Sequence, residues 1–379
     1  MIRGWLSILF FCLTAVVSSG RAAADNSCVE ASRLVKEGIG RSDGSSEEEK
    51  AYRDASTQCP QMSEAHYNLG VLLLKQGKLA EAEASFRKAL EIKSDPAFQL
   101  ALAGVKLELG ELDAALEVYE DILRSDPRND RAAQGIAVVL DKRGQGAEAI
   151  AVLQKVTSVD KPSARAFYNL AVMHDKLTQS EQAASAYARA MELDPLFADA
   201  FFFGGLLYER LGRLPEAVRA LGRAAELRPD HAEVQAALGV IAEKSGDLDR
   251  AALAFKKVVG LKPDDVGALV NLGVVLIHKQ QESQAELSLA RAVSIEPSNP
   301  RALGTLGWAQ LELGKFDEAE GTLKKAIELD AANAQAHNNL GVLYERLGRK
   351  AEAEKMFKAA AKLDPSLDAA GGNLQKFTR

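Results

Sequence analysis

The amino-acid sequence predicts an all-α protein made of helix hairpins stacked one on another. Three observations indicate this fold class. The composition favours helix over sheet, because alanine, leucine, glutamate and lysine are abundant and only 6% of the residues are aromatic. An alanine recurs at an almost constant spacing of 34 residues. Glycine and proline recur at fixed distances from that alanine, where they would end helices.

The recurring alanine marks nine units. The first step between alanines is 33 residues and every later step is 34. A period of this length is the signature of a solenoid whose unit is one helix hairpin. We number the positions of each unit as slots 1 to 34, with Ser63 first in the first unit and Ala334 first in the last. The recurring alanine then holds slot 20, at Ala82, Ala115, Ala149, Ala183, Ala217, Ala251, Ala285, Ala319 and Ala353.

The first half of each unit predicts one helix. Slots 4, 7, 8 and 11 are mostly apolar and fall on one side of a helix with 3.6 residues per turn. Slot 8 is always glycine or alanine, which lets two helix axes approach closely. Glycine at slot 15 would end this helix with a left-handed cap, at Gly77, Gly110, Gly144, Gly212, Gly246, Gly314 and Gly348.

The second half of each unit predicts another helix, with slots 20, 24 and 27 on its buried side. Slot 24 is large and apolar, for example Phe86, Tyr119, Tyr187, Phe255 and Phe357. Proline near slot 32 ends most units, because it has no backbone amide to donate. One hairpin alone buries too little apolar surface to be stable, so the units must stack.

This pattern resembles the tetratricopeptide repeat over residues 63–367, which would then hold nine repeats. The resemblance implies an α-α solenoid, a right-handed superhelix of stacked antiparallel hairpins. Single positions depart from the pattern, and we expect them to weaken individual turns without breaking the register. They are Lys106 at apolar slot 11, Thr178 and Gln280 at the turn slot 15, Pro162 one residue late, and Ala331 in place of proline.

Residues 25–62 are interpreted as a degenerate extra repeat. Tyr52, Ala55 and Pro60 would hold slots 24, 27 and 32. The stretch 42–49, rich in glycine, serine and acidic residues, would replace the usual tight turn.

Two cysteines of this repeat predict a disulfide. In a hairpin of this kind the start of the first helix lies beside the end of the second, and Cys28 and Cys59 hold those two places. A disulfide closing this loop would contribute roughly 3–4 kcal/mol in the chain-entropy model. The alternative is a pair of free thiols.

Residues 1–24 are interpreted as a signal peptide. Arg3 precedes a short apolar run, and Ala22 and Ala24 are the small residues that a signal peptidase reads. The apolar run is shorter than the roughly 20 residues of a membrane-spanning helix. We expect cleavage, a periplasmic or secreted location and no membrane insertion after cleavage; the alternative is a retained anchor. Residues 368–379 would form a short C-terminal tail, too short to cap the stack. Either the last repeat then frays, or something else covers it, and self-association through this repeat is one such alternative.

The sequence predicts no enzyme activity, cofactor or metal. It contains no His-Glu-x-x-His motif and no phosphate-binding glycine loop. Its five histidines fall in repeat slots, and packing is the simplest role for those at slots 4 and 11, which are His66, His337 and His174. The net charge of −6 argues against nucleic acid as a partner.

A binding surface is expected on the first helices. Slots 2, 5, 9, 12 and 13 point away from the face that packs the hairpin, and the superhelix implied by the resemblance would line a concave groove with them. Slots 5 and 9 are mostly apolar, which predicts a site for an extended segment or an amphipathic helix. The alternative is that neighbouring first helices bury slot 9 between units. The groove residues selected here are Tyr67, Tyr168, Val172, Phe202, Leu206, Val274 and Trp308.

Polar groups add two further expectations. In similar repeat domains, asparagines on the inner wall bond the backbone of a bound peptide, because an amide both donates and accepts. The asparagines at slot 6 are Asn68, Asn169, Asn271 and Asn339. Basic residues at slot 13 would either attract acidic ligand groups or be cancelled by carboxylates at slot 12.

Together these observations predict a non-catalytic scaffold or adaptor in the bacterial cell envelope. Its partner would be a protein or peptide, whose identity the sequence leaves open. Two alternatives remain: a self-assembling structural protein, and an accessory subunit of a polysaccharide-export or cell-wall-synthesis system.

Overall fold

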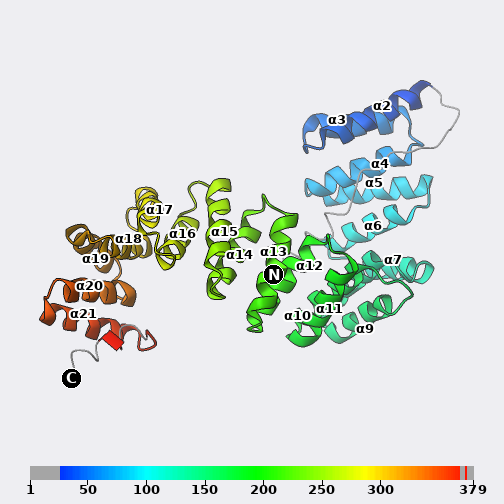
Figure 1. The fold of residues 1–379 in the computed structure, drawn as a ribbon. Coiled ribbons are helices and arrows are strands. Elements are labelled where there is room, and N and C mark those ends of the chain that lie inside the picture. Colours follow the sequence, from blue (N-terminus) through cyan, green and yellow to red (C-terminus); the bar gives the residue numbers. More distant parts are fainter. Residues whose placement is uncertain (1–25, 368–371, 374–379) are drawn as a thin grey trace. The chain divides into compact units, whose positions relative to one another are not determined.

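A computed structural model describes residues 26–367, 372 and 373 (Figure 1). Helices joined by turns make up this part of the chain, which contains no strand. The chain divides into two compact units, one ending at Pro195 and one beginning at Leu196. The predicted signal peptide and most of the predicted tail lie outside the described residues.

The first unit holds five hairpins, each formed by two consecutive helices that pack together. The first helices are α2 (Asn26–Arg41), α4 (Ser63–Lys75), α6 (Pro96–Glu108), α8 (Asp130–Lys142) and α10 (Ala164–Lys176). The second helices are α3 (Ser46–Gln58), α5 (Leu79–Ile92), α7 (Leu112–Ser125), α9 (Gly146–Thr157) and α11 (Ser180–Leu193).

The second unit repeats this arrangement, and its first helices also contact one another, as α16 does with α18 and α18 with α20. The first helices are α12 (Ala198–Arg210), α14 (Ala232–Lys244), α16 (Val266–His278), α18 (Pro300–Glu312) and α20 (Ala334–Arg346). The second helices are α13 (Leu214–Leu227), α15 (Leu248–Leu261), α17 (Glu282–Ile295), α19 (Phe316–Leu329) and α21 (Lys350–Leu363). The predicted all-α solenoid of antiparallel hairpins is therefore confirmed.

Each hairpin is held by a large side chain that fits over a small residue. Phe255 at slot 24 of α15 is fully buried, and a Cβ added to Gly239 at slot 8 of α14 would lie 2.8 Å from its ring. Gly307 stands in the same relation to Leu323, whose Cγ would lie 2.5 Å from the added Cβ. The small residue at slot 8 is therefore required by the bulk at slot 24.

The turns inside the hairpins have a left-handed residue at slot 15. Gly212 and Gly314 have φ values of 72° and 73° there. Thr178 and Gln280, which replace glycine at this slot, have φ values of 58° and 57°. The turn is therefore kept in all these repeats, and the two departures adopt a backbone region that is costly for a residue with a side chain.

The N-terminal hairpin has the structure of a repeat with an altered turn. Only residues 42–45 form the turn, because Ser46–Glu49 begin α3, which corrects the predicted loop over 42–49. The Ser45 side chain accepts a hydrogen bond from the backbone amide of Glu48, and the Glu48 carboxylate accepts one from the amide of Gly44. These two bonds satisfy amides at the helix start.

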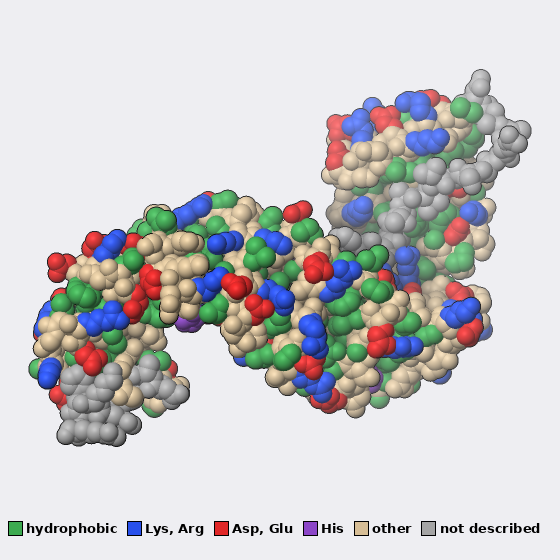
Figure 2. Space-filling view, viewed as in Figure 1, with side chains coloured by type: hydrophobic (Ala, Val, Ile, Leu, Met, Phe, Trp, Pro, Cys, Tyr) green, Lys and Arg blue, Asp and Glu red, His purple; other side chains and the backbone are tan. Residues whose placement is uncertain are grey.

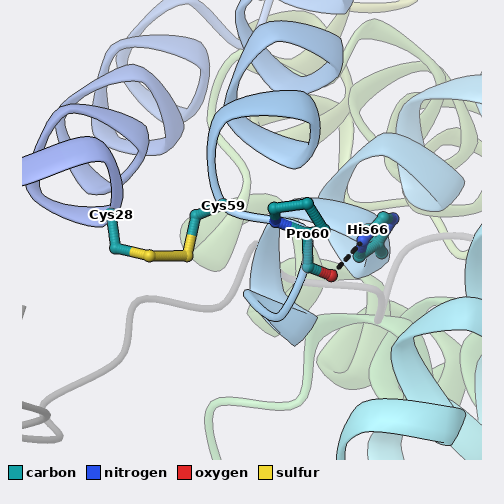
Figure 3. Close-up of a disulfide and its surroundings, with 4 residues drawn as sticks. All are labelled: Cys28, Cys59, Pro60 and His66. Atoms are coloured by element: carbon teal, nitrogen blue, oxygen red, sulfur yellow. Dashed lines mark hydrogen bonds between the residues drawn. A yellow bond between two sulfur atoms is a disulfide. The ribbon is translucent and has the colours of Figure 1, made fainter. Parts of the chain in front are cut away.

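A disulfide joins Cys28 of α2 to Cys59 at the end of α3, with Cα atoms 4.9 Å apart (Figure 3). It links the start of the first helix to the end of the second. Beside it, the His66 ring donates a hydrogen bond from Nε2 to the carbonyl oxygen of Pro60 at 3.0 Å, which ties the next hairpin to the same turn.

Lys106, the charged residue at an apolar slot, is buried on α6. Its ammonium group donates to Glu111 at 2.7 Å and lies 3.3 Å from Glu83. These contacts, first the one to Glu111, raise the pKa of Lys106.

In the described part of the chain, no helix is both long and apolar enough to cross a bilayer.

Candidate functional site

The aromatic side chains at slot 5 lie in the core, which corrects the prediction that they line a groove. Tyr67 on α4 is 2% exposed, and its ring stacks on Phe98 of α6 with centroids 4.7 Å apart. Burial raises the pKa of the Tyr67 hydroxyl to about 12. Tyr168 is buried against Tyr187, and Phe202 is buried in the core of the second unit. Phe98 belongs to the first helix of the following repeat, and this helix covers slot 5 of the repeat before it. A large ring at slot 5, such as that of Tyr67, is therefore buried in the core.

Most of the asparagines at slot 6 are also buried, which corrects their predicted place on a groove wall. Asn68, Asn169 and Asn339 are all almost fully buried. Asn271 on α16 is half-buried, and its Oδ1 accepts a hydrogen bond from the exposed Arg301 side chain of α18 at 2.6 Å. Of the four asparagines, Asn271 alone therefore lies at the surface.

The apolar residues at slot 9 differ between the two units. In the first unit Val71 and Val138 are buried, as the alternative interpretation of this slot requires, and Val172 is half-buried. In the second unit none of them is buried. Val240 is 47% exposed, and its counterparts on the other first helices are half-buried. We call this row the first-helix surface: Leu206, Val240, Val274, Trp308 and Val342, on α12, α14, α16, α18 and α20.

Ion pairs between consecutive repeats border this surface. Lys244 at slot 13 of α14 lies 2.6 Å from Glu209 at slot 12 of α12. In the same relation, His278 on α16 lies 4.0 Å from Glu243 on α14. Lys176 and Asp141 form the equivalent pair in the first unit. At Lys176 and Lys244, the basic residue of slot 13 is therefore paired with a carboxylate at slot 12 of the preceding repeat, the second of the two expectations for this slot.

Further along the same edge, Arg346 on α20 pairs with the Glu312 carboxylate of α18 at 2.8 Å. Its guanidinium also donates to the carbonyl oxygen of Leu311 at 3.2 Å. Figure 2 shows one face of the molecule, on which acidic and basic side chains are interspersed rather than gathered by sign. The first-helix surface is thus apolar along its centre and close to neutral at its edge.

An aromatic pair lies on this surface. Trp308 on α18 is half-buried, and its ring meets the His278 ring of α16 edge to face with centroids 5.6 Å apart. Because His278 also lies beside Glu243, three consecutive first helices contribute to one cluster. Trp308 is thus a predicted groove residue that does lie at the surface, together with Leu206 and Val274.

Sequence reasoning missed part of this site. Val240 and Val342 belong to the row but were not selected, although their slot gave the signal. His278 holds slot 13, in series with the basic residues of that slot, but its contact with Trp308 was not predicted. The signal for this contact is the spacing of 30 residues, which separates slot 13 of one repeat from slot 9 of the next.

Solved structures of repeat proteins are similar to parts of the chain. YrrB, described as a TPR protein with an unusual peptide-binding site, is 24% identical over 49% of this chain and 96% of its own, with a TM-score of 0.39. MamA from Desulfovibrio magneticus RS-1 is 27% identical over 45% of this chain and 97% of its own, with a TM-score of 0.40. The C-terminal part of a TPR repeat-containing protein from Cytophaga hutchinsonii is 18% identical over 63% of this chain and 98% of its own, with a TM-score of 0.46.

No curated protein matches the chain. Family models described as tetratricopeptide repeat, in contrast, match most of it. The matched residues are 63–96, 106–171, 168–232, 204–266, 242–304 and 305–368. These matches fall on the hairpins of both units, from α4 to α21. The chain therefore belongs to the tetratricopeptide-repeat family.

Proposed function

We propose that this protein is a non-catalytic scaffold that binds a segment of another protein on its first-helix surface. Tetratricopeptide-repeat proteins are typically scaffolds that bind protein or peptide partners. The observation that carries the proposal for this chain is the row from Leu206 to Val342. Five consecutive first helices each present an apolar side chain that remains partly exposed.

The spacing of the row indicates the form of the bound segment. Packed helices lie about 8–10 Å apart, and an extended chain rises about 3.3 Å per residue. An extended segment crossing the first helices would therefore place an apolar side chain on the row about every third residue. Trp308 is the largest side chain of the row, and exposed aromatic rings are frequent anchors of protein interfaces.

Polar groups beside the row would hold the backbone of such a segment. The Arg301 side chain uses one amino group to bond Asn271, which leaves other guanidinium donors directed to solvent. A backbone carbonyl of the segment could accept from them. The interspersed charges next to the row favour a partner that is recognised by apolar contacts more than by net charge.

We further propose a periplasmic or secreted location. The support is the sequence of residues 1–24 together with the disulfide between Cys28 and Cys59, because disulfides persist mainly in oxidising compartments. Fractionation of host cells, followed by mass spectrometry of the N-terminus, tests this proposal. A protein that begins near Asp25 in the periplasm or medium supports it, and one that keeps Met1 in the cytoplasm refutes it.

The binding proposal is tested by capturing partners from host envelope extract on the immobilised protein. Val240→Glu combined with Val274→Glu places two charges in the middle of the row, and we expect loss of the captured partner. Ala290→Glu, at an exposed position of second helix α17, is the matched control and should keep it. Equal capture by all three proteins would refute the first-helix surface as the binding site.

A further inference from the structure

The second helices of two consecutive repeats leave a groove on the other side of the hairpins. It lies between α13 and α15, has a volume of about 360 Å³, and has Val218, Leu238 and Ala254 among its apolar lining residues. Gly222 contributes to its open side, since a Cβ added there would meet no atom within 4 Å. We call this the second-helix groove. Its lining residues on α14 are Gln235 and Leu238 and do not include Val240, so the groove is separate from the row of slot-9 side chains.

The border of the groove is basic. Arg219, Arg223, Arg250 and Lys257 line it, with Glu226 as the single acidic residue. Arg223 lies 2.9 Å from Glu226, and Arg250 lies 3.6 Å from Asp247. Arg219 and Lys257 make no ion pair or hydrogen bond with any described residue. Two exposed cations therefore lie beside the apolar floor of the groove, and neither is paired with a described carboxylate.

An exposed leucine stands at the edge of the same groove. Leu253 on α15 is 58% exposed, and Leu287, at the same slot of α17, is 74% exposed. Outside α15 and α17, slot 22 of the repeats holds small or polar residues: Ala84, Glu117, Ala151, Ser185, Arg219, Gly321 and Lys355. Leu253 thus adds an exposed apolar side chain to a groove that Arg219 and Lys257 also line.

We propose that the second-helix groove binds an acidic segment of a protein partner. An apolar side chain of that segment would fill the groove over Leu238 and beside Leu253. Its carboxylates would pair with Arg219 and Lys257. Charge complementarity selects this occupant, because a groove with two unpaired cations favours an anionic ligand and the apolar floor adds a requirement for a hydrophobic residue.

A nucleic acid or polyphosphate fits these observations less well. The lining contains no aromatic ring on which a base could stack. The chain as a whole carries a net charge of −6, which opposes a long polyanion. A protein segment needs only a local match of charge.

The test uses the purified protein and a labelled amphipathic peptide with one face of leucine and one of glutamate. Fluorescence anisotropy measures its affinity, alongside peptides in which glutamine or lysine replaces glutamate. We expect the glutamate peptide to bind, and binding to weaken as salt rises. Arg219→Glu with Lys257→Glu should weaken binding by about tenfold or more, since attraction becomes repulsion at two contacts. Leu253→Ser should weaken it as well.

The matched control is Lys155→Glu with Lys325→Glu. These exposed lysines hold slot 26 in other repeats, the slot of Lys257, and the double variant should bind the peptide normally. Arg219→Lys with Lys257→Arg keeps both charges and should also bind. The proposal is overturned if the glutamate peptide does not bind, if the glutamine peptide binds equally well, or if the charge-reversed variant binds unchanged. It is also overturned if polyphosphate displaces the peptide and binds more tightly, which would make the groove a phosphate site.

Discussion

Trp308 and His278 belong to consecutive repeats, yet their rings meet edge to face with centroids 5.6 Å apart. The contact joins the centre of the first-helix surface to its charged edge. The fluorescence of Trp308 can also be used to follow changes at this surface. The chain has two tryptophans, and the other, Trp5, lies in the predicted signal peptide. In protein that begins at Asp25, tryptophan emission therefore comes from the candidate site.

His278→Ala should shift the emission of Trp308 to longer wavelength, because the ring loses its neighbour and meets more water. The lost edge-to-face contact should cost about 0.5–1 kcal/mol of stability. Steady-state fluorescence and urea unfolding measure the two effects. His231→Ala, at an exposed turn position, is the control and should leave the emission unchanged. An identical spectrum for His278→Ala would contradict the contact.

Two glycines of one repeat should respond to alanine in opposite directions. In Gly307→Ala the new Cβ would lie 2.5 Å from Leu323 Cγ, so the hairpin must open, at a cost of about 1–3 kcal/mol. In Gly321→Ala the new Cβ meets no atom within 4 Å, so the better helix former should gain up to about 1 kcal/mol. Urea unfolding of both variants measures these changes. Equal effects would mean that slot 8 is not packed as described.

The link between the first two hairpins should depend on pH. Glu49 on α3 bonds Lys78 at 2.8 Å and Arg53 at 2.8 Å, which holds the pKa of the Glu49 carboxyl at about 2 instead of 4.5. A depressed carboxyl pKa stabilises the fold above pH 4.5, and this contribution is lost as the pH falls from 4.5 towards 2.

Glu49→Gln should therefore cost about 1 kcal/mol at pH 7, since both cations are partly exposed to solvent. The difference from wild type should shrink below pH 4.5. Urea unfolding at pH 7, 5 and 3 measures it, with Glu47→Gln, exposed on the same helix, as the control. A difference that grows as the pH falls would refute this role of Glu49.

Reduction of the disulfide should loosen the N-terminal hairpin selectively. Cys28 and Cys59 are 31 residues apart, and opening a loop of this size should lower the free energy of unfolding by roughly 3–4 kcal/mol. Because each repeat contacts only its neighbours, the effect should stay near α2 and α3. Hydrogen exchange with and without reductant, or in Cys28→Ser, should show faster exchange of α2 and α3 and unchanged exchange of α16 to α19. Uniform acceleration along the chain would contradict this.

Most of the fold could be predicted because the repeat constraints are local. The match between Gly239 and Phe255 is set by residues 16 positions apart in one hairpin, and the period shows it nine times. The turn at Thr178 illustrates the limit. Its sequence lacks the glycine signal, but packing of α10 on α11 imposes the left-handed backbone on threonine.

The site was predicted only in part, because exposure depends on the neighbouring repeat. Tyr67 was assigned to a groove from its own helix, yet Phe98 of the next helix covers it. The same argument from one helix also selected Trp308. This side chain does remain partly exposed, and the neighbouring ring that it contacts, His278, is itself exposed. The second-helix groove escaped prediction because it needs Arg219 and Lys257, from two repeats, to face one open space.

The most direct test of the central proposal is photo-crosslinking in living host cells. A photoreactive residue at Val274 or Trp308 lies on the first-helix surface, and one at Lys325, exposed on second helix α19, is the control. We predict a crosslinked partner protein, identified by mass spectrometry, from the first two positions and not from Lys325. The same products at all three positions, or only adducts between copies of this chain, would contradict the proposed scaffold function, and the latter would favour self-assembly.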